Sequence, residues 1–277
     1  MPRSCTVRRL AAGVAAWWVL GVMACQSGAG SGSITPPPDS IPPFPPPAQA
    51  SCANRPAGYR IIWDEEWDVV PGSWTVYGGA GRLALLQDPT APASGPNVFR
   101  GRFPAGMPGG VGPYNLERQF GRDVSELYVC VVAWISPNWT DNGNTGTKFF
   151  WWETPYAGTA QSLGHYANLT PRLGLNLQSA GGILNRNMFA NFNMIANAGR
   201  WHAIEYLVRG NTAPANGTLT IWVDGTRVAQ ETDVTFFYPG QAPRFQALRL
   251  NPTYGGGLNP VPYDLDLRID RWVVAAP

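Results

Sequence analysis

The sequence predicts an all-β fold, a sandwich of two antiparallel sheets, for the folded part of this 277-residue chain. Short runs rich in β-branched and aromatic residues recur between Gly, Pro and Asn residues, which is typical of sandwiches and barrels. In several of these runs apolar and polar residues alternate, as they do in a strand with one buried face. No stretch keeps the spacing of an amphipathic helix over several turns.

The N-terminus has the features of a targeting segment. Positive charge at Arg3, Arg8 and Arg9 precedes an apolar run from Leu10 to Val22. This run is shorter than the roughly 20 apolar residues that a membrane-spanning helix needs. We therefore expect residues 1–24 to be a signal peptide, which is excluded from the fold.

The segment ends in Val22-Met23-Ala24-Cys25, which resembles the lipobox of bacterial lipoproteins. The resemblance implies that Cys25 is lipidated and becomes the mature N-terminus; an ordinary secretory signal with a chance cysteine is the alternative. Gln26 stands where an aspartate would favour inner-membrane retention in many Gram-negative bacteria. We expect a lipid-anchored protein of the cell envelope, at the outer membrane or the cell surface.

Residues 25–51 are rich in Pro, Gly and Ser and carry almost no charge. A segment of this composition cannot bury a core, and its proline runs favour an extended polyproline conformation. We expect a linker here, followed by a single domain over residues 52–277.

The charge of the chain excludes one class of partner. Removal of the signal peptide takes away three arginines and no acidic residue, so the formal net charge falls from +2 to −1. Nucleic-acid binding needs a clustered basic face, which this composition does not predict. We expect contact with a membrane only through the lipid anchor.

Two cysteines remain once Cys5 and Cys25 are set aside. Cys52 lies where the linker meets the domain, and Cys130 lies in a predicted strand. Because disulfides persist in exported proteins, we expect these two residues to be joined; a pair of inert thiols is the alternative. We predict no metal site, since no group of Cys and His residues has zinc-binding spacing.

The predicted strands follow one another along the whole domain. In chain order they are Tyr59–Trp63, Trp74–Tyr77, Leu83–Leu86, Asn97–Phe103, Leu127–Ile135, Lys148–Trp152, Leu173–Leu177, His202–Arg209, Thr218–Val223, Phe245–Leu250 and Leu265–Val274. Asp224-Gly225 is the two-residue turn expected for a hairpin between Thr218–Val223 and Thr226–Ala229.

Alternation assigns the faces of these strands. Leu173, Leu175 and Leu177 share one face of their strand, and the opposite face carries Arg172, Gly174, Asn176 and Gln178. The strands at 218–223 and 265–274 alternate in the same way. The polar faces mix Arg, Asn and Gln with Trp222, which is more than solubility requires, so we interpret them as the candidate functional surface.

Three stretches resemble concanavalin-A-like jelly-roll domains, a superfamily of lectins, glucanases and polysaccharide lyases. Residues 201–225 match the pattern W-x-x-x-E … G-x-L-x-x-W-x-D-G, residues 134–150 resemble the strands before it, and residues 267–274 resemble the closing strand. The resemblance, notably to polysaccharide lyases and laminarinase- or LamG-like modules, implies a two-sheet jelly roll whose cleft takes an extended polysaccharide. The same fold also hosts plain adhesion modules.

A glucanase needs two carboxylates about 5 Å apart on one face of a strand. The acidic cluster Asp64-Glu65-Glu66-Trp67-Asp68 lies at the entrance of the domain and lacks the Glu-x-Asp-x-x-Glu signature of laminarinase-like jelly rolls. Glycoside hydrolysis is therefore disfavoured.

A lyase that breaks a uronic-acid chain by β-elimination needs Arg, Asn or Gln to stabilise developing charge, and Tyr or His to move protons. Arg172, Asn176 and Gln178 form the expected stabilising set. The candidate catalytic residues are Arg172, His165, Tyr166 and Tyr254, with Tyr206 as a further proton carrier. The Gln-Ile-His and Tyr-x-Lys-x-Gly-x-Tyr motifs of the best-known alginate lyase jelly rolls are absent.

Plain binding needs flat aromatic side chains for sugar faces, and polar side chains for sugar hydroxyls. The candidate ligand-binding residues are Lys148, Trp152, Arg172, Asn176, Gln178, Glu205, Arg209, Trp222 and Tyr254. The alternative interpretation of this polar stripe is an ordinary solvated face.

Asp141-Asn142-Gly143-Asn144 is expected to be a turn, since it lacks the ligand spacing of an EF-hand, and Gly255-Gly256-Gly257 a loop beside the cleft. We predict no cofactor, although a structural calcium ion, which some jelly rolls hold, stays an open alternative. We predict a surface lipoprotein that binds an extended polysaccharide. Cleavage of that polymer by a lyase reaction and a non-catalytic adhesion role stay open alternatives.

Overall fold

The computed structural model describes residues 51–67, 69, 74–77, 79, 81–141, 146–154, 163–177, 186–237, 244–256 and 259–277. The predicted signal peptide, Cys25 and the linker up to residue 50 lie outside the described residues, as do Gln178, most of the Asp141–Asn144 turn, and Gly257. In the described part of the chain no helix is long and apolar enough to cross a membrane.

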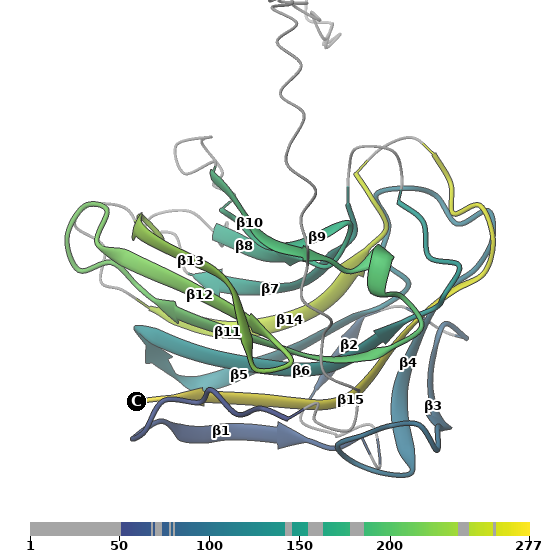
Figure 1. Ribbon diagram of the computed structural model, residues 1–277, viewed down its shortest axis with the longest axis horizontal. Coiled ribbons are helices and arrows are strands. Elements are labelled where there is room, and N and C mark those ends of the chain that lie inside the picture. The colour runs from purple at the N-terminus through teal and green to yellow at the C-terminus, as the bar shows by residue number, and fades with distance from the viewer. Residues whose placement is uncertain are drawn as a thin grey trace, which may run out of the picture. The chain divides into compact units, whose positions relative to one another are not determined.

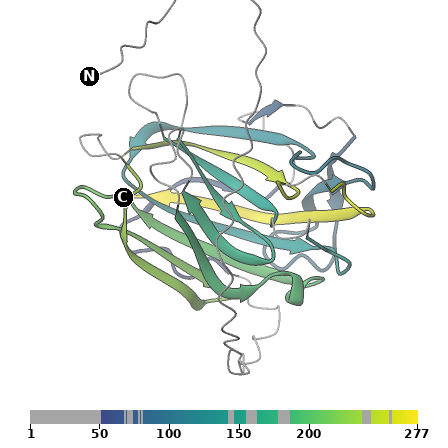
Figure 2. The ribbon, with the colours of Figure 1, turned by 90° about the horizontal axis from the view of Figure 1, so that it is seen from above.

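The larger of two antiparallel sheets contains eight strands. In spatial order they are β13 (Thr226–Val234), β12 (Gly217–Val223), β11 (Trp201–Arg209), β6 (Glu126–Ile135), β15 (Leu265–Ala276), β4 (Asn97–Phe103) and β3 (Leu83–Gln87), with β1 (Arg60–Glu65) paired to the C-terminal half of β15. Figure 2 shows β15, the yellow C-terminal strand, crossing the middle of the domain. The closing strand thus pairs with the first.

The smaller sheet contains seven strands. In spatial order they are β10 (Arg186–Asn193), β9 (Arg172–Leu177), β8 (Leu163–Asn168), β7 (Lys148–Thr154), β14 (Phe245–Thr253), β5 (Asn115–Val124) and β2 (Thr75–Tyr77) (Figure 1). The sequence did not predict β5, β8 and β10. A short 3-10 helix, Ile195–Asn197, follows β10.

The inner faces of the two sheets form one core. The leucines of β9 are buried in it, as are Leu219, Ile221 and Val223 of β12. Trp152 of the smaller sheet meets Tyr206 of the larger sheet at a ring-centroid distance of 5.9 Å. This packing confirms the predicted sandwich of two antiparallel sheets.

The predicted hairpin turn is also confirmed. Asp224 and Gly225 both have positive φ, 50° and 78°, as a type I′ turn between β12 and β13 requires. The Asp224 carboxylate accepts a hydrogen bond from the backbone of Ala203 and contacts Nδ1 of His202 at 2.8 Å. His202 is therefore held in a structural role.

The chain that enters the domain covers part of the outer face of the larger sheet. A disulfide joins Cys52 to Cys130 of β6, as expected from the sequence, with Cα atoms 5.7 Å apart. The fully buried carboxylate of Glu205 accepts hydrogen bonds from the backbone and side-chain nitrogens of Asn54 at 2.7 and 2.8 Å and from Tyr128 Oη at 2.5 Å. These contacts fix the entering segment on β6 and β11.

Replacing both Cys52 and Cys130 with alanine is expected to lower the free energy of unfolding by about 4 kcal/mol, because the bond closes a loop with a sequence separation of 78 residues. Urea unfolding followed by tryptophan fluorescence measures the change. The wild-type protein under reducing conditions should lose a similar amount. A double variant as stable as the oxidised wild type would contradict a stabilising role for the bond.

Candidate functional site

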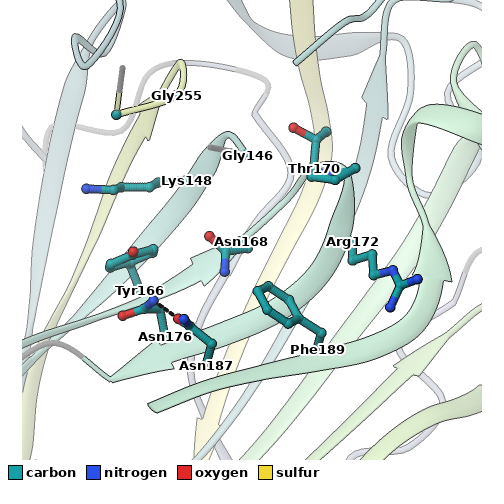
Figure 3. A pocket seen from close by; sticks show the side chains of 12 residues that line it. Gly146, Lys148, Tyr166, Asn168, Thr170, Arg172, Asn176, Asn187, Phe189 and Gly255 are labelled. Carbon is teal, nitrogen blue, oxygen red and sulfur yellow. Dashed lines mark hydrogen bonds between the residues drawn. The ribbon is translucent and has the colours of Figure 1, made fainter. Parts of the chain in front are cut away.

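A hollow of about 520 Å³ opens on the outer face of the smaller sheet, within the range of about 300–1,000 Å³ typical of ligand sites. Strands β7 to β10 supply most of its walls (Figure 3). The described residues that line it are Gly146, Lys148, Tyr166, Asn168, Thr170, Pro171, Arg172, Asn176, Asn187, Phe189, Gly255 and Gly256. Gly255 and Gly256 thus lie beside the hollow, as the sequence predicted.

Strand alternation directs these side chains outward. Asn176 lies between the buried Leu175 and Leu177, and Phe189 lies between the buried Met188 and Ala190. Pairing between strands then sets the residues in two rows across the sheet. One row runs Asn187, Asn176, Tyr166 and Trp151, and the other runs Phe189, Gly174, Asn168 and Lys148.

Lys148, the only lysine of the chain, lies at one side of the hollow. Its Nζ is 4.6 Å from the ring centroid of Tyr166 and 4.9 Å from that of Trp151, which are favourable distances for cation–π contacts. Burial lowers the pKa of the Lys148 ammonium below its ordinary value. Lys148 therefore loses its proton at a lower pH than a solvent-exposed lysine does.

The pKa of Tyr166 shifts in the opposite direction. Burial raises the pKa of its hydroxyl, and the hydrogen bond with Asn176 offsets part of this effect. The Asn176 amide also donates to Oδ1 of Asn187, so two neighbouring strands hold its orientation. The hollow thus brings together a lysine that loses its proton more easily and a tyrosine that keeps its proton.

The rim of the hollow depends on a close approach between two loops. Oγ1 of Thr170 accepts a hydrogen bond from the backbone of Thr147 at 3.0 Å and donates to the Asp141 carboxylate at 2.6 Å. A Cβ atom on Gly146 would lie 1.5 Å from the carbonyl oxygen of Thr170. Glycine at 146 therefore allows the two loops to meet.

The hollow is cationic. Its described lining includes Lys148 and Arg172 and contains no acidic residue. Arg172 is exposed, and its guanidinium has no hydrogen-bond or ion-pair partner among the described residues. A guanidinium held at the surface without a carboxylate partner is suited to bind an anionic group of a ligand.

A pair of carboxylates that the sequence analysis missed lies farther along the same sheet. Nη2 of Arg249 in β14 contacts Glu117 of β5 at 2.6 Å and Glu153 of β7 at 2.5 Å. Both carboxylates contact the same arginine and neither lines the hollow, so they do not restore the glycosidase interpretation. Among the described residues no three His, Cys, Asp or Glu side chains gather as a metal-binding group.

Three candidates point into the core and do not reach the hollow. Trp152 and Tyr206 pack against each other between the sheets. His165 lies in β8, and its Nε2 donates to the carbonyl of Phe236 at 3.0 Å. Burial lowers the pKa of His165 to about 4, so the ring is neutral at physiological pH and isolated from solvent.

Three further candidates lie on the larger sheet. Trp222 packs near Cys52 and Tyr59 on its outer face, and Glu205 is buried beneath the entering segment. Arg209 is exposed at the end of β11, where it pairs with Glu126 at 3.2 Å. The expectation that Trp222 shares a hollow with Arg172 and Asn176 is therefore wrong, because each sheet has its own outer face.

Two remaining groups are structural. Tyr254 is buried against Phe103 at a centroid distance of 6.4 Å, although its neighbours Gly255 and Gly256 line the hollow. In the acidic cluster at the domain entrance, Asp64 is bonded to Arg271 at 2.5 Å. In the same cluster Glu65 is buried and pairs with Arg118, so both carboxylates are held in ion pairs away from the hollow.

The expected site residues that do line the hollow are Lys148, Tyr166, Arg172 and Asn176. Sequence reasoning missed Asn168, Asn187 and Phe189, which lie on the two unpredicted strands β8 and β10. The alternation of the buried Met188, Ala190 and Phe192 was the signal that could have revealed β10.

No family model and no curated protein matches the sequence. Solved structures do resemble the domain. An alginate lyase from a Chlorella virus has a TM-score of 0.52 at 14% identity, covering 74% of this chain and 94% of that chain. An endo-β-1,4-glucuronan lyase from the fungus Trichoderma reesei has a TM-score of 0.51 at 13% identity, covering 80% and 92%.

A third similar structure is an alginate lyase in complex with an alginate trisaccharide, with a TM-score of 0.50 at 13% identity, covering 77% of this chain and 97% of that chain. Similarity at this level of identity establishes the fold. The domain is a two-sheet antiparallel jelly-roll sandwich, as the sequence predicted.

Replacing Gly146 with alanine is expected to lower the free energy of unfolding by about 1–3 kcal/mol, because the added methyl group would overlap the Thr170 carbonyl. Thermal unfolding of the purified domain measures the loss. Gly256→Ala is the matched control, since among the described residues no heavy atom beyond its chain neighbours lies within 4 Å of a Cβ there, and it should change stability by less than about 0.5 kcal/mol. Equal stability of the two variants would contradict the described rim.

Proposed function

We propose that the protein binds an acidic polysaccharide in the hollow and cleaves it by β-elimination. The observation that carries the proposal is the pairing of Lys148 and Tyr166, whose pKa values move in opposite directions, in a cationic hollow. Titratable groups whose environments separate their pKa values are the expected base and acid of a site. The names of the similar structures, lyases of alginate and of glucuronan, agree with this reaction.

Each group has a defined part in the proposed reaction. The neutral amine of Lys148 takes the proton from the carbon that bears the carboxylate of one uronic-acid unit. The electron pair of that C–H bond forms a carbon–carbon double bond as the bond to the glycosidic oxygen breaks. Tyr166 Oη gives its proton to the departing oxygen, and solvent afterwards restores both groups.

The amides of the hollow act on the developing charge. As the proton leaves, negative charge moves onto the carboxylate oxygens of the substrate, and donors already in place stabilise it. Asn168 and Asn176 lie beside Tyr166 on the same face, in the two rows described above. Neither amide needs to reorient far, since Asn168 is largely buried and Asn176 is bonded to Asn187.

Lys148→Arg is expected to reduce turnover by on the order of 10²–10⁴-fold while keeping the positive charge, because arginine cannot serve as a base at neutral pH. Tyr166→Phe should lose turnover to a similar degree. The ultraviolet absorbance of the unsaturated product, with alginate and glucuronan as substrates, measures the rate. Tyr263→Phe, at a tyrosine that is 44% exposed outside the hollow, is the control and should keep full activity.

The pH profile provides a second readout. Because the neutral amine is the base, kcat/KM should rise with pH through the lowered pKa of Lys148, below the ordinary 10.5 of a lysine. Wild-type protein that binds either polymer but releases no unsaturated product would replace the lyase with a binding module. Wild-type protein that neither binds nor cleaves would favour the adhesion role.

We further propose that Cys25 carries a lipid that anchors the domain to the cell envelope, on the strength of the lipobox resemblance. Cys25→Ala is expected to abolish incorporation of a labelled fatty acid and to release the protein from the membrane fraction. Cys5→Ala, a change at the other cysteine of the N-terminal segment, should keep both properties. Labelling that persists in Cys25→Ala would refute the anchor.

A further inference from the structure

Phe189 has an unusual position within the hollow. Its side chain is 51% exposed, and of the large apolar side chains described as exposed it alone lines the hollow. A single exposed apolar residue is common on protein surfaces and carries little weight alone. The packing around Phe189 distinguishes it from such a residue.

The ring of Phe189 lies over a glycine of the neighbouring strand, where no side chain fills the space. Gly174 of β9 is its direct cross-strand partner. A Cβ atom at position 174 would lie 2.4 Å from the carbonyl oxygen of Met188 and 3.0 Å from Cδ1 of Phe189. The absence of a side chain at 174 therefore lets β10 approach closely and lets the aromatic ring settle over β9.

Amide groups surround this ring. Asn187 lies two residues before Phe189 on the same face, and Asn168 faces Gly174 in the same row as Phe189. Figure 3 shows the ring beside Asn168 and Asn187, with Arg172 beyond it. A sugar ring presents apolar C–H groups on its face and hydroxyl groups on its edge, so a flat apolar ring bordered by amides matches both.

Arg172 lies on the far side of the ring from Lys148 (Figure 3). Lys148 is two strands away from Gly174 in one row, and Arg172 precedes Gly174 by two residues on the same face. Strand spacing and rise place the Cα atoms of the two cations roughly 12 Å apart. The hollow can therefore hold a second anionic unit beside the one that meets Lys148.

We infer that Phe189 and Arg172 form a second sugar subsite, in which the ring stacks on a uronic-acid unit and the guanidinium binds its carboxylate. This inference rests on the proposed function and deepens it. It makes the hollow specific for adjacent uronic-acid units, and it separates the group that holds the chain from the groups that react. Phe189 and Arg172 determine affinity, whereas Lys148 and Tyr166 determine turnover.

Affinity electrophoresis in cold gels that contain alginate or glucuronan tests the subsite. Phe189→Ala and Arg172→Ala are each expected to raise the dissociation constant roughly tenfold, and Phe189→Trp should stay within about threefold of the wild type. Phe189→Leu keeps an apolar side chain without a flat ring and should lose about as much as Phe189→Ala. Ile61→Ala, at an apolar residue 47% exposed on the other sheet, is the matched control and should bind as the wild type does.

The outcomes separate the inference from the proposed function. Unchanged binding by Phe189→Ala and Arg172→Ala, with normal retardation of the wild type, would overturn the second subsite alone. A wild-type dissociation constant for Phe189→Leu would show that a flat ring is not needed, and would overturn the proposed stacking on Phe189. A wild-type protein that neither gel retards would overturn the proposed function and the subsite with it. Circular dichroism of each variant identifies loss of fold, and Phe189→Trp keeps the stacking test valid if Phe189→Ala unfolds.

Discussion

The structure depends on burial of the two inner sheet faces in a single core. A strand in such a sandwich divides its residues between two environments, and the core fixes which residues occupy the inner one. In β9 the three leucines fill the core, so Arg172 and Asn176 have to face outward. The same constraint turns Tyr166 and Phe189 out of β8 and β10. The side chains that line the hollow are thus those that alternation leaves outside the core.

The two outer faces differ in exposure because the segment that enters the domain covers part of the larger sheet's outer face. On the larger sheet the disulfide at Cys52 and the hydrogen bonds from Asn54 to Glu205 hold the entering segment in place. A buried carboxylate is costly without partners, so Glu205 keeps that segment attached. The smaller sheet keeps an open face around Lys148, and the hollow lies on this face.

Alternation within one strand was readable from the sequence, and contacts between strands were not. The pattern of β9 correctly turned Arg172 and Asn176 away from the core. It could not tell that Trp222, correctly placed on an outer face, belongs to the other sheet, because that depends on pairing between distant segments. Of the adjacent Trp151 and Trp152, the second was wrongly expected to face the ligand. A register shift between Lys148 and Trp151 disturbs the simple alternation of β7.

The proposed function requires that the outer face of β7 to β10 receives an acidic polysaccharide. Nuclear magnetic resonance of the isotope-labelled domain, titrated with an alginate or glucuronan trisaccharide, tests it most directly. The account predicts that amide shifts change around Tyr166, Asn176 and Phe189 and stay constant in β11 to β13. Shifts confined to β11 to β13, or no shifts with either trisaccharide, would contradict it.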